Sequence, residues 1–337
     1  MIKSISQRVG ISLLAAALTA GAAYAQDKKE INFGIISTES SQNLRQLWDP
    51  FLADMSKKTG YEIKAFFAPD YAGIIQGMRF DKVDIAWYGN KSAMEAVDRA
   101  NGEVIYQTVD KDGKPGYWSL LIAHKDSPIN NVEDMLKNAK SLNFGNGDPN
   151  STSGFLVPSY YVFAQNNVDP SKIFKRTVNA NHEVNANHEV NALSVANKQV
   201  DVATNNTESL DRLHASNPEK AAQIKEIWRS PLIASDPIVW RKNLPEEVKT
   251  KFTEFFDTYG DKPEELAVLH GLSWAKFKPS SNDQLLPIRQ LELFKQRNQV
   301  AADEKLSDAD KQTQLKKLDE DLEKLAASLK ALDAKQS

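Results

Sequence analysis

Hydrophobic residues along this chain fall into short apolar runs that alternate with amphipathic segments. Residues 31–36 form a largely apolar run, which predicts a buried strand. In residues 41–58 the apolar side chains recur every three or four positions, which predicts a helix with one buried face. Strands at 62–67 and 83–87, with a short helix at 72–79 between them, complete a β-α-β-α-β order. That order predicts a parallel sheet with helical crossovers.

A second set of alternating elements begins near residue 118. Its expected elements, in chain order, are a strand at 118–123, a helix at 131–138, a strand at 142–144, a helix opened by residues 151–153, a strand at 174–178, a helix at 190–198 and a strand at 200–203. A strand at 238–240 then returns to the first set, which helices near 245–259 and 263–271 complete.

These two sets predict an α/β protein with two lobes and a ligand cleft between them. We expect lobe 1 to comprise residues 26–118 and 238–300, and lobe 2 to comprise residues 119–237. The chain would then cross between the lobes twice. In open α/β sheets, ligands bind at the carboxyl ends of the strands, facing helix N-termini. Two lobes around a cleft can also close on a ligand by a hinge motion.

The C-terminal part of the chain has a different pattern. Residues 303–335 are rich in Lys, Glu, Asp, Ala and Leu and contain neither Gly nor Pro. A heptad-like stripe of leucines runs through them, at Leu315, Leu318, Leu322, Leu325, Leu329 and Leu332. The pattern predicts a long helix within residues 301–337 that packs on its own chain or pairs with another subunit. The narrow stripe and its charged flanks favour a homodimer.

The first 25 residues have the features of an export signal. Lys3 and Arg8 give a positive start, residues 11–18 are mostly apolar, and Ala23-Tyr24-Ala25 fits a cleavage site. The apolar run is too short to cross a bilayer. We therefore expect a mature chain that starts near Gln26.

The amino-acid composition limits the cellular compartments and the binding partners that we expect for this chain. The chain has no cysteine, which excludes disulfides, a lipid anchor on an N-terminal Cys and thiolate metal sites. A large, exported, cysteine-free protein fits the bacterial periplasm. The net charge is −3 and no basic stripe marks the mature chain, so nucleic acid is not an expected partner.

The strongest chemical feature is the run Ser151-Thr152-Ser153, which opens a helix directly after a turn-forming segment at 145–150. Hydroxyls at a helix start lie beside backbone N–H groups that lack intrahelical partners, and the helix dipole adds partial positive charge there. Such a place suits a tetrahedral oxyanion such as a phosphate or a phosphonate. The alternative is a plain N-cap before a core helix.

A short duplication lies between the later elements. Residues 179–184 are repeated without change as residues 185–190. His182 and His188 are too far apart for the H-E-x-x-H metalloprotease pattern, and on a helix they would point to different faces. We therefore expect no metal and no cofactor. Because the helix expected at 190–198 continues directly from the second copy, His188 is favoured over His182 as a site residue, and the extra loop costs little entropy.

Several segments resemble the periplasmic phosphonate-binding proteins of ABC transporters, in particular those of the 2-aminoethylphosphonate-binding type. They span nearly the whole mature chain and are FGIISTES (33–40), FAPDYAGI (67–74), DIAWYGN (84–90), GYWS (116–119), DPNSTSG (148–154), NNTE (205–208) and SDPIVW (235–240). The resemblance implies a type II periplasmic binding fold. It also implies a carrier without catalytic activity that delivers its ligand to an inner-membrane permease.

The resemblance assigns the phosphonate-binding residues by position. Ser151, Thr152 and Ser153 correspond to the donors to the phosphonate oxygens. Tyr117 corresponds to a tyrosine that contacts the phosphonate, and His188 or His182 corresponds to a histidine that does so.

It assigns the remaining ligand contacts as well. Tyr71 corresponds to a tyrosine that lines the ligand from the first lobe, and Glu208 and Asp236 correspond to the carboxylates that hold an ammonium group. Each of these side chains also has a purely structural alternative, such as packing, capping or shaping a turn. The duplication departs from the family pattern and leaves the position of the histidine open.

The expected function is therefore uptake of an alkylphosphonate, above all 2-aminoethylphosphonate. One alternative keeps the class and changes the ligand to phosphite, methylphosphonate or phosphate. A second is a periplasmic phosphoesterase or serine hydrolase, with Ser153 and His188 as nucleophile and base. No G-x-S-x-G turn surrounds that serine, which argues against catalysis. A structural coiled-coil adaptor is supported by the C-terminal helix alone.

Overall fold

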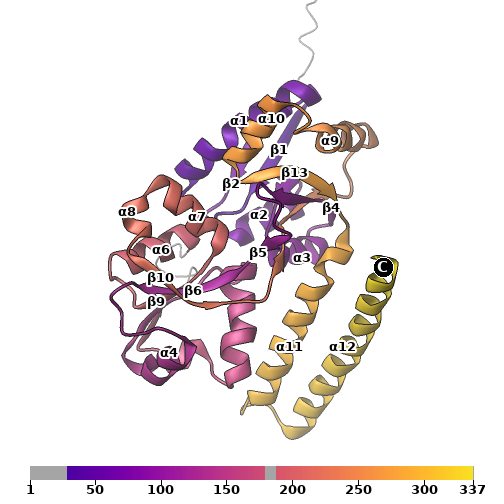
Figure 1. Cartoon of the computed structure of the whole chain (residues 1–337). Coiled ribbons are helices and arrows are strands. Elements are labelled where there is room, and N and C mark those ends of the chain that lie inside the picture. The colour runs from indigo at the N-terminus through magenta and orange to yellow at the C-terminus, as the bar shows by residue number, and fades with distance from the viewer. Residues whose placement is uncertain (1–28, 179–186, 337) are drawn as a thin grey trace, which may run out of the picture.

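The computed structural model describes residues 29–178 and 187–336. Within them, two α/β lobes each form around one sheet, and a pair of helices lies beside the lobes (Figure 1). The predicted two-lobe α/β fold is thus confirmed. The export signal expected at residues 1–25 and the first copy of the duplication, with His182, lie outside the described residues.

Lobe 1 is built on a six-stranded sheet with the order β13-β4-β12-β3-β1-β2. Strands β1, β2 and β3 pair in parallel, as their sequence pattern predicted, and β12 returns antiparallel between β3 and β4. The strands are β1 (Glu30–Ile35), β2 (Glu62–Phe67), β3 (Ile85–Trp87), β4 (Gly102–Asp110), β12 (Pro237–Arg241) and β13 (Trp274–Pro279). The helices are α1 (Ser41–Thr59), α2 (Tyr71–Arg79), α3 (Asn90–Arg99), α9 (Glu246–Thr258) and α10 (Pro263–Gly271).

Helix α1 illustrates how the local sequence sets an element of this lobe. The Ser40 hydroxyl accepts a hydrogen bond from the Asn43 N–H at 3.3 Å and caps the helix start. Gly60 ends the helix with a φ of +78°, a left-handed conformation that glycine adopts without steric cost. Between these ends, the buried Trp48 and Phe51 rings pack together in the lobe 1 core, with centroids 6.0 Å apart.

Lobe 2 is built on a five-stranded sheet with the order β10-β6-β9-β7-β8. Its strands are β6 (Ser119–His124), β7 (Asn143–Gly145), β8 (Arg176–Val178), β9 (Val202–Asn206) and β10 (Ile224–Arg229). Its helices are α4 (Val132–Asn138), α5 (Pro170–Ile173), α6 (His188–Ala196), α7 (Thr207–Ser216) and α8 (Pro218–Ala221), with short 3₁₀ turns η1 (Ala139–Ser141) and η4 (Ala164–Asn166) and π-helical turns η2 (Thr152–Leu156) and η3 (Ser159–Phe163). Strands β8, β7 and β9 are parallel, and β6 is antiparallel to β9 and to β10.

The two crossings between the lobes pair with each other. Strand β5 (Gly116–Tyr117) lies antiparallel to β11 (Ile233–Ala234) as a separate two-stranded sheet. The chain leaves lobe 1 through a 3₁₀ turn, η5 (Asn282–Leu285), and enters α11 (Leu286–Ala302).

The long C-terminal helix, α12 (Asp308–Gln336), packs on α11 (Figure 1). Arg297 of α11 forms an ion pair with Asp319 of α12, with a shortest N–O distance of 2.6 Å. The leucine stripe of α12 is buried or half-buried, with Leu325 9% exposed. The predicted helix therefore packs, at least in part, on its own chain, and the homodimer stays a prediction.

Candidate ligand-binding site

A cavity of about 270 Å³ lies between the two lobes. Its walls come mainly from residues at or just after the carboxyl ends of strands in both lobes, the position expected of a ligand in open α/β sheets. The lining residues are Ile36, Thr38, Tyr71, Trp87, Gly89, Tyr117, Ser151, Thr152, Ser153, His188, Asn206, Glu208, Arg212 and Asp236.

The three consecutive hydroxyls open a helical segment, as predicted, but its first turn is π-helical. The Ser151 hydroxyl caps this turn by accepting a hydrogen bond from the Gly154 N–H at 2.9 Å. All three side chains are buried and line the cavity. Hydroxyls and N–H groups at the start of a helical segment are donors to an anion, and they need no metal to bind one.

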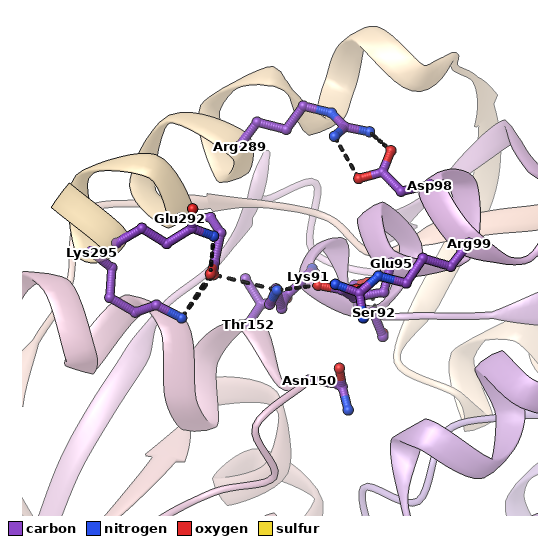
Figure 2. Close-up of polar contacts among 12 residues, drawn as sticks. Lys91, Ser92, Glu95, Asp98, Arg99, Asn150, Thr152, Arg289, Glu292 and Lys295 are labelled. Atoms are coloured by element: carbon purple, nitrogen blue, oxygen red, sulfur yellow. Dashed lines mark hydrogen bonds and ion pairs between the residues drawn. The ribbon is translucent and has the colours of Figure 1, made fainter. Parts of the chain in front are cut away.

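Two hydrogen bonds join this rim to lobe 1. The Thr152 hydroxyl accepts a hydrogen bond from the Lys91 N–H at 2.8 Å, next to the start of α3 (Figure 2). The Asp148 carboxylate accepts one from the Tyr71 N–H at 3.1 Å. The Gly89 backbone also lies close to this rim: a Cβ there would lie 3.1 Å from Thr152 Oγ1. The lobes are thus held together directly at the cavity.

His188 lies at the first position of α6, where Asn187 caps the helix by accepting the Val190 N–H at 2.9 Å. Its Nε2 lies 3.4 Å from Ser153 Oγ and 3.2 Å from the Asn206 side-chain nitrogen. Burial, with the nearby Arg212 charge, lowers the pKa of His188 to about 3. The imidazole is therefore neutral at pH 7. So weak a base is poorly suited to activate Ser153 as a nucleophile.

Two acidic side chains, Glu208 and Asp236, also line the cavity. The Asp236 carboxylate is buried and accepts a hydrogen bond from the Tyr117 hydroxyl at 2.9 Å. Burial and the negative charge of Glu208 raise the pKa of Asp236 well above its usual range. Burial also raises the pKa of Glu208 and of Tyr117, so Tyr117 remains a protonated donor. A cationic ligand group would stabilise the ionised forms of Glu208 and Asp236, which burial disfavours.

A cationic side chain, that of Arg212, lines the cavity together with the acids. Arg212, on α7, forms an ion pair with Glu39, which follows β1 in lobe 1. Burial disfavours the charged guanidinium, but Glu39 and Glu208 outweigh that effect and raise the pKa of Arg212. Arg212 in turn opposes the rise in the pKa of Glu208. The pair also forms another link between the lobes.

The structure brings every predicted site residue in its described part to this one cavity. Sequence reasoning missed six lining residues, Ile36, Thr38, Trp87, Gly89, Asn206 and Arg212. A signal for Arg212 was present, because it follows Glu208 by four residues and such residues are neighbours on a helix. Thr38, Trp87, Gly89 and Asn206 fall within the segments that carry the resemblance, but nothing in their local pattern marked them.

The described residues show neither a group of three or more His, Cys, Asp or Glu side chains that could hold a metal ion, nor a helix that is long and apolar enough to span a membrane.

Comparison with known proteins adds independent evidence. A family model described as "ABC transporter, phosphonate, periplasmic substrate-binding protein" matches residues 33–285. The phosphonates-binding periplasmic protein of Escherichia coli is 61% identical over 312 residues, which are 92% of this chain and 90% of that protein.

Solved structures agree with this match. A binding protein component of an ABC phosphonate transporter from Pseudomonas aeruginosa is 65% identical, with a TM-score of 0.88 over 91% of this chain and 100% of that one. PhnD1 from Prochlorococcus marinus, solved with methylphosphonate, is 22% identical, with a TM-score of 0.68 over 79% of this chain and 97% of that one, and shares the fold. The chain therefore belongs to the family of periplasmic phosphonate-binding proteins, which are substrate-binding components of ABC transporters and not enzymes.

Proposed function

We propose that this protein binds 2-aminoethylphosphonate in the cavity between its lobes and delivers it to an inner-membrane permease. The observation that carries the proposal is that hydroxyl donors and carboxylate acceptors line one small cavity. Ser151, Thr152 and Ser153 form a pole of donors, and Glu208 and Asp236 form a pole of acceptors. A ligand with an anionic head and a cationic tail satisfies both.

The donor pole matches the chemistry of a phosphonate. Its three oxygens carry up to two negative charges and accept several hydrogen bonds. The hydroxyls of Ser151–Ser153, the Tyr71 hydroxyl and the N–H groups at the start of the helical segment can supply them. Tyr117 and His188, which the resemblance assigns to the phosphonate, line the same cavity, and the Tyr117 hydroxyl donates to Asp236. Burial raises the pKa of the Tyr71 hydroxyl, so Tyr71 remains a donor at neutral pH.

The acceptor pole distinguishes an aminophosphonate from a simpler anion. An ammonium group between Glu208 and Asp236 would form charge-assisted hydrogen bonds, which are roughly twice as strong as neutral ones. A ligand without the amine would leave Glu208 and Asp236 without a cationic ligand group, and Asp236 would keep only its hydrogen bond from Tyr117. That costs on the order of 1–3 kcal/mol, or more for a charged group, hence about one to two decades in affinity.

The competing proposal is a carrier of methylphosphonate, phosphite or phosphate. The Prochlorococcus marinus protein was solved with methylphosphonate, which has a phosphonate head and no amine. The buried acids of this chain argue against such a ligand as the preferred one. An anion would be repelled by them in their ionised form, which an ammonium group favours.

Calorimetric titration with 2-aminoethylphosphonate and methylphosphonate tests the proposal. We expect Glu208→Gln and Asp236→Asn to weaken 2-aminoethylphosphonate by about 10- to 100-fold, and methylphosphonate by less than about threefold. Glu226→Gln is the matched control, because Glu226 lies on β10 of the same lobe and does not line the cavity. Equal losses for the two ligands would exclude the ammonium role, and equal affinities in the unmodified protein would favour the broader carrier.

A further inference from the structure

Three buried side-chain polar atoms have no hydrogen-bond partner in the part of the chain that the structure describes. They are Thr38 Oγ1, Tyr61 OH and Trp87 Nε1. Each of these side chains belongs to a residue that is only about 5% exposed. Buried polar groups are nearly always paired, because an unpaired one costs about 1–3 kcal/mol. Unpaired atoms at a cavity therefore point to a partner that is part of the bound state.

Two of these three atoms belong to residues that line the ligand cavity. Thr38 and Trp87 also line an adjoining cavity of about 290 Å³, and Arg212 is the third residue that the two cavities share. The rest of the second cavity is mostly apolar and is lined by Leu44, Leu47, Trp48, Leu272, Trp274 and Glu39. Thr38 and Trp87 thus mark the junction of the two spaces, whereas Tyr61 lines neither of them.

Both residues are held firmly in place. The Trp87 ring packs against Trp48 and Trp274, with centroids 5.3 and 6.0 Å apart, and its backbone belongs to β3, between β1 and β12. The Thr38 N–H donates to the Ile36 carbonyl at 2.9 Å, and the Thr38 carbonyl accepts the Glu189 N–H of lobe 2 at 3.4 Å. A partner therefore has to come to these polar atoms.

The chemistry of the two groups restricts that partner. An indole N–H is a donor only, whereas a threonine hydroxyl both donates and accepts. An ammonium group has no lone pair for Trp87. A carboxylate would add to the excess of negative charge, because Glu39, Glu208 and Asp236 face the single cation Arg212 around these cavities. A neutral hydroxyl can accept from Trp87 and donate to Thr38.

We propose that Thr38 and Trp87 form a hydroxyl-binding subsite for aminoalkylphosphonates that carry a hydroxyl group on the carbon chain. This inference rests on the proposed function and extends its substrate class. With 2-aminoethylphosphonate, which has no such group, the two polar atoms stay unpaired.

The test is calorimetric titration with 2-aminoethylphosphonate and with each enantiomer of 2-amino-1-hydroxyethylphosphonate. We expect the unmodified protein to bind one enantiomer within about tenfold of 2-aminoethylphosphonate. Thr38→Val and Trp87→Phe, which keep the shape or the ring packing, should each lower the affinity for that enantiomer relative to 2-aminoethylphosphonate by about fivefold. Tyr61→Phe removes the third unpaired atom outside both cavities, and should leave the ratio unchanged.

Three results would overturn the subsite while leaving the proposed function intact. The first is that both enantiomers bind more than about a hundredfold more weakly than 2-aminoethylphosphonate. The second is that Thr38→Val and Trp87→Phe weaken all ligands equally. The third is that Tyr61→Phe changes the affinity ratio as much as these two variants do. Thermal unfolding of each variant shows whether it is folded. If Trp87→Phe does not fold, Thr38→Val still decides the test. If the unmodified protein bound no 2-aminoethylphosphonate, the proposed function would fail and the subsite with it.

Discussion

At the scale of single residues, burial sets the protonation states of the titratable side chains that line the cavity. Burial keeps His188 neutral by lowering its pKa to about 3, and burial raises the pKa of Glu208 and of Asp236. In the empty cavity the acids therefore tend to hold protons at pH values where an exposed carboxyl is ionised. An ammonium group favours their ionised form. The proposed binding of an aminophosphonate would therefore be coupled to proton release.

The coupling predicts a pH dependence that a simple phosphonate does not share. Affinity for 2-aminoethylphosphonate should fall as the pH drops through the raised pKa range of the acids, because protons then compete with the ammonium group. Titration in two buffers of different ionisation enthalpy measures the protons released. Methylphosphonate is the control for the ionisation of the phosphonate head. Equal proton release for both ligands, or release unchanged in Asp236→Asn, would contradict the coupling.

At the scale of elements, α11 connects the two lobes. Its Glu292 contacts Lys91 of α3 at 3.3 Å and Lys295 at 2.8 Å, and Lys91 also pairs with Glu95 at 2.5 Å (Figure 2). Two residues further along α11, the Phe294 ring stacks on Tyr160 of lobe 2, with centroids 5.6 Å apart. Because the Lys91 N–H binds Thr152, this ionic cluster lies one residue from the ligand cavity.

The cluster gives a stability prediction with an internal control. Burial raises the pKa of Glu292, but Lys295 and Lys91 outweigh this and hold it below its usual range. Glu292→Gln should therefore lower the free energy of unfolding by about 1–3 kcal/mol, measured by denaturant titration. The more exposed pair Arg289–Asp98 is the control, and Asp98→Asn should cost less than about 1 kcal/mol. Comparable losses in both variants would contradict a special role for the cluster.

Part of the fold and of the site could be predicted from the sequence. Periodicity predicted the parallel β1-β2-β3 arrangement, and the three consecutive hydroxyls predicted the helix start at the cavity. The π-helical geometry of that start was not predictable, because the residue types there suit an α-helix equally well. The four-residue spacing from Glu208 was a signal for Arg212, but Thr38 and Trp87 were missed for a different reason. They become part of the site only when the lobes come together, and the local sequence does not encode that contact.

At the scale of the whole molecule, the lobes lie in contact around the cavity. Glu39 pairs with Arg212 across the lobes, and Glu189 of lobe 2 accepts the Ser40 N–H at 2.8 Å. Together with the Lys91–Thr152 bond, these contacts surround the ligand position. A hinge motion about β5 and β11 would have to break them to admit a ligand.

The homodimer is also a prediction at this scale. Helix α12 packs on α11, and we propose that the half-buried leucines of its stripe, with Leu325 excluded, contribute to the contact with a second subunit. Removing residues 303–337 should convert a dimer to a monomer in sedimentation velocity. The same truncation should retain ligand affinity, because no residue after 302 lines the cavity. An unchanged oligomeric state after truncation would contradict the proposed role of α12.

The most direct test of the account is a crystal structure of the protein with 2-aminoethylphosphonate. We expect the phosphonate oxygens within hydrogen-bond distance of the Ser151, Thr152 and Ser153 hydroxyls, and the amine nitrogen between Glu208 and Asp236. A ligand bound in the opposite orientation, or outside the cavity between the lobes, would contradict it.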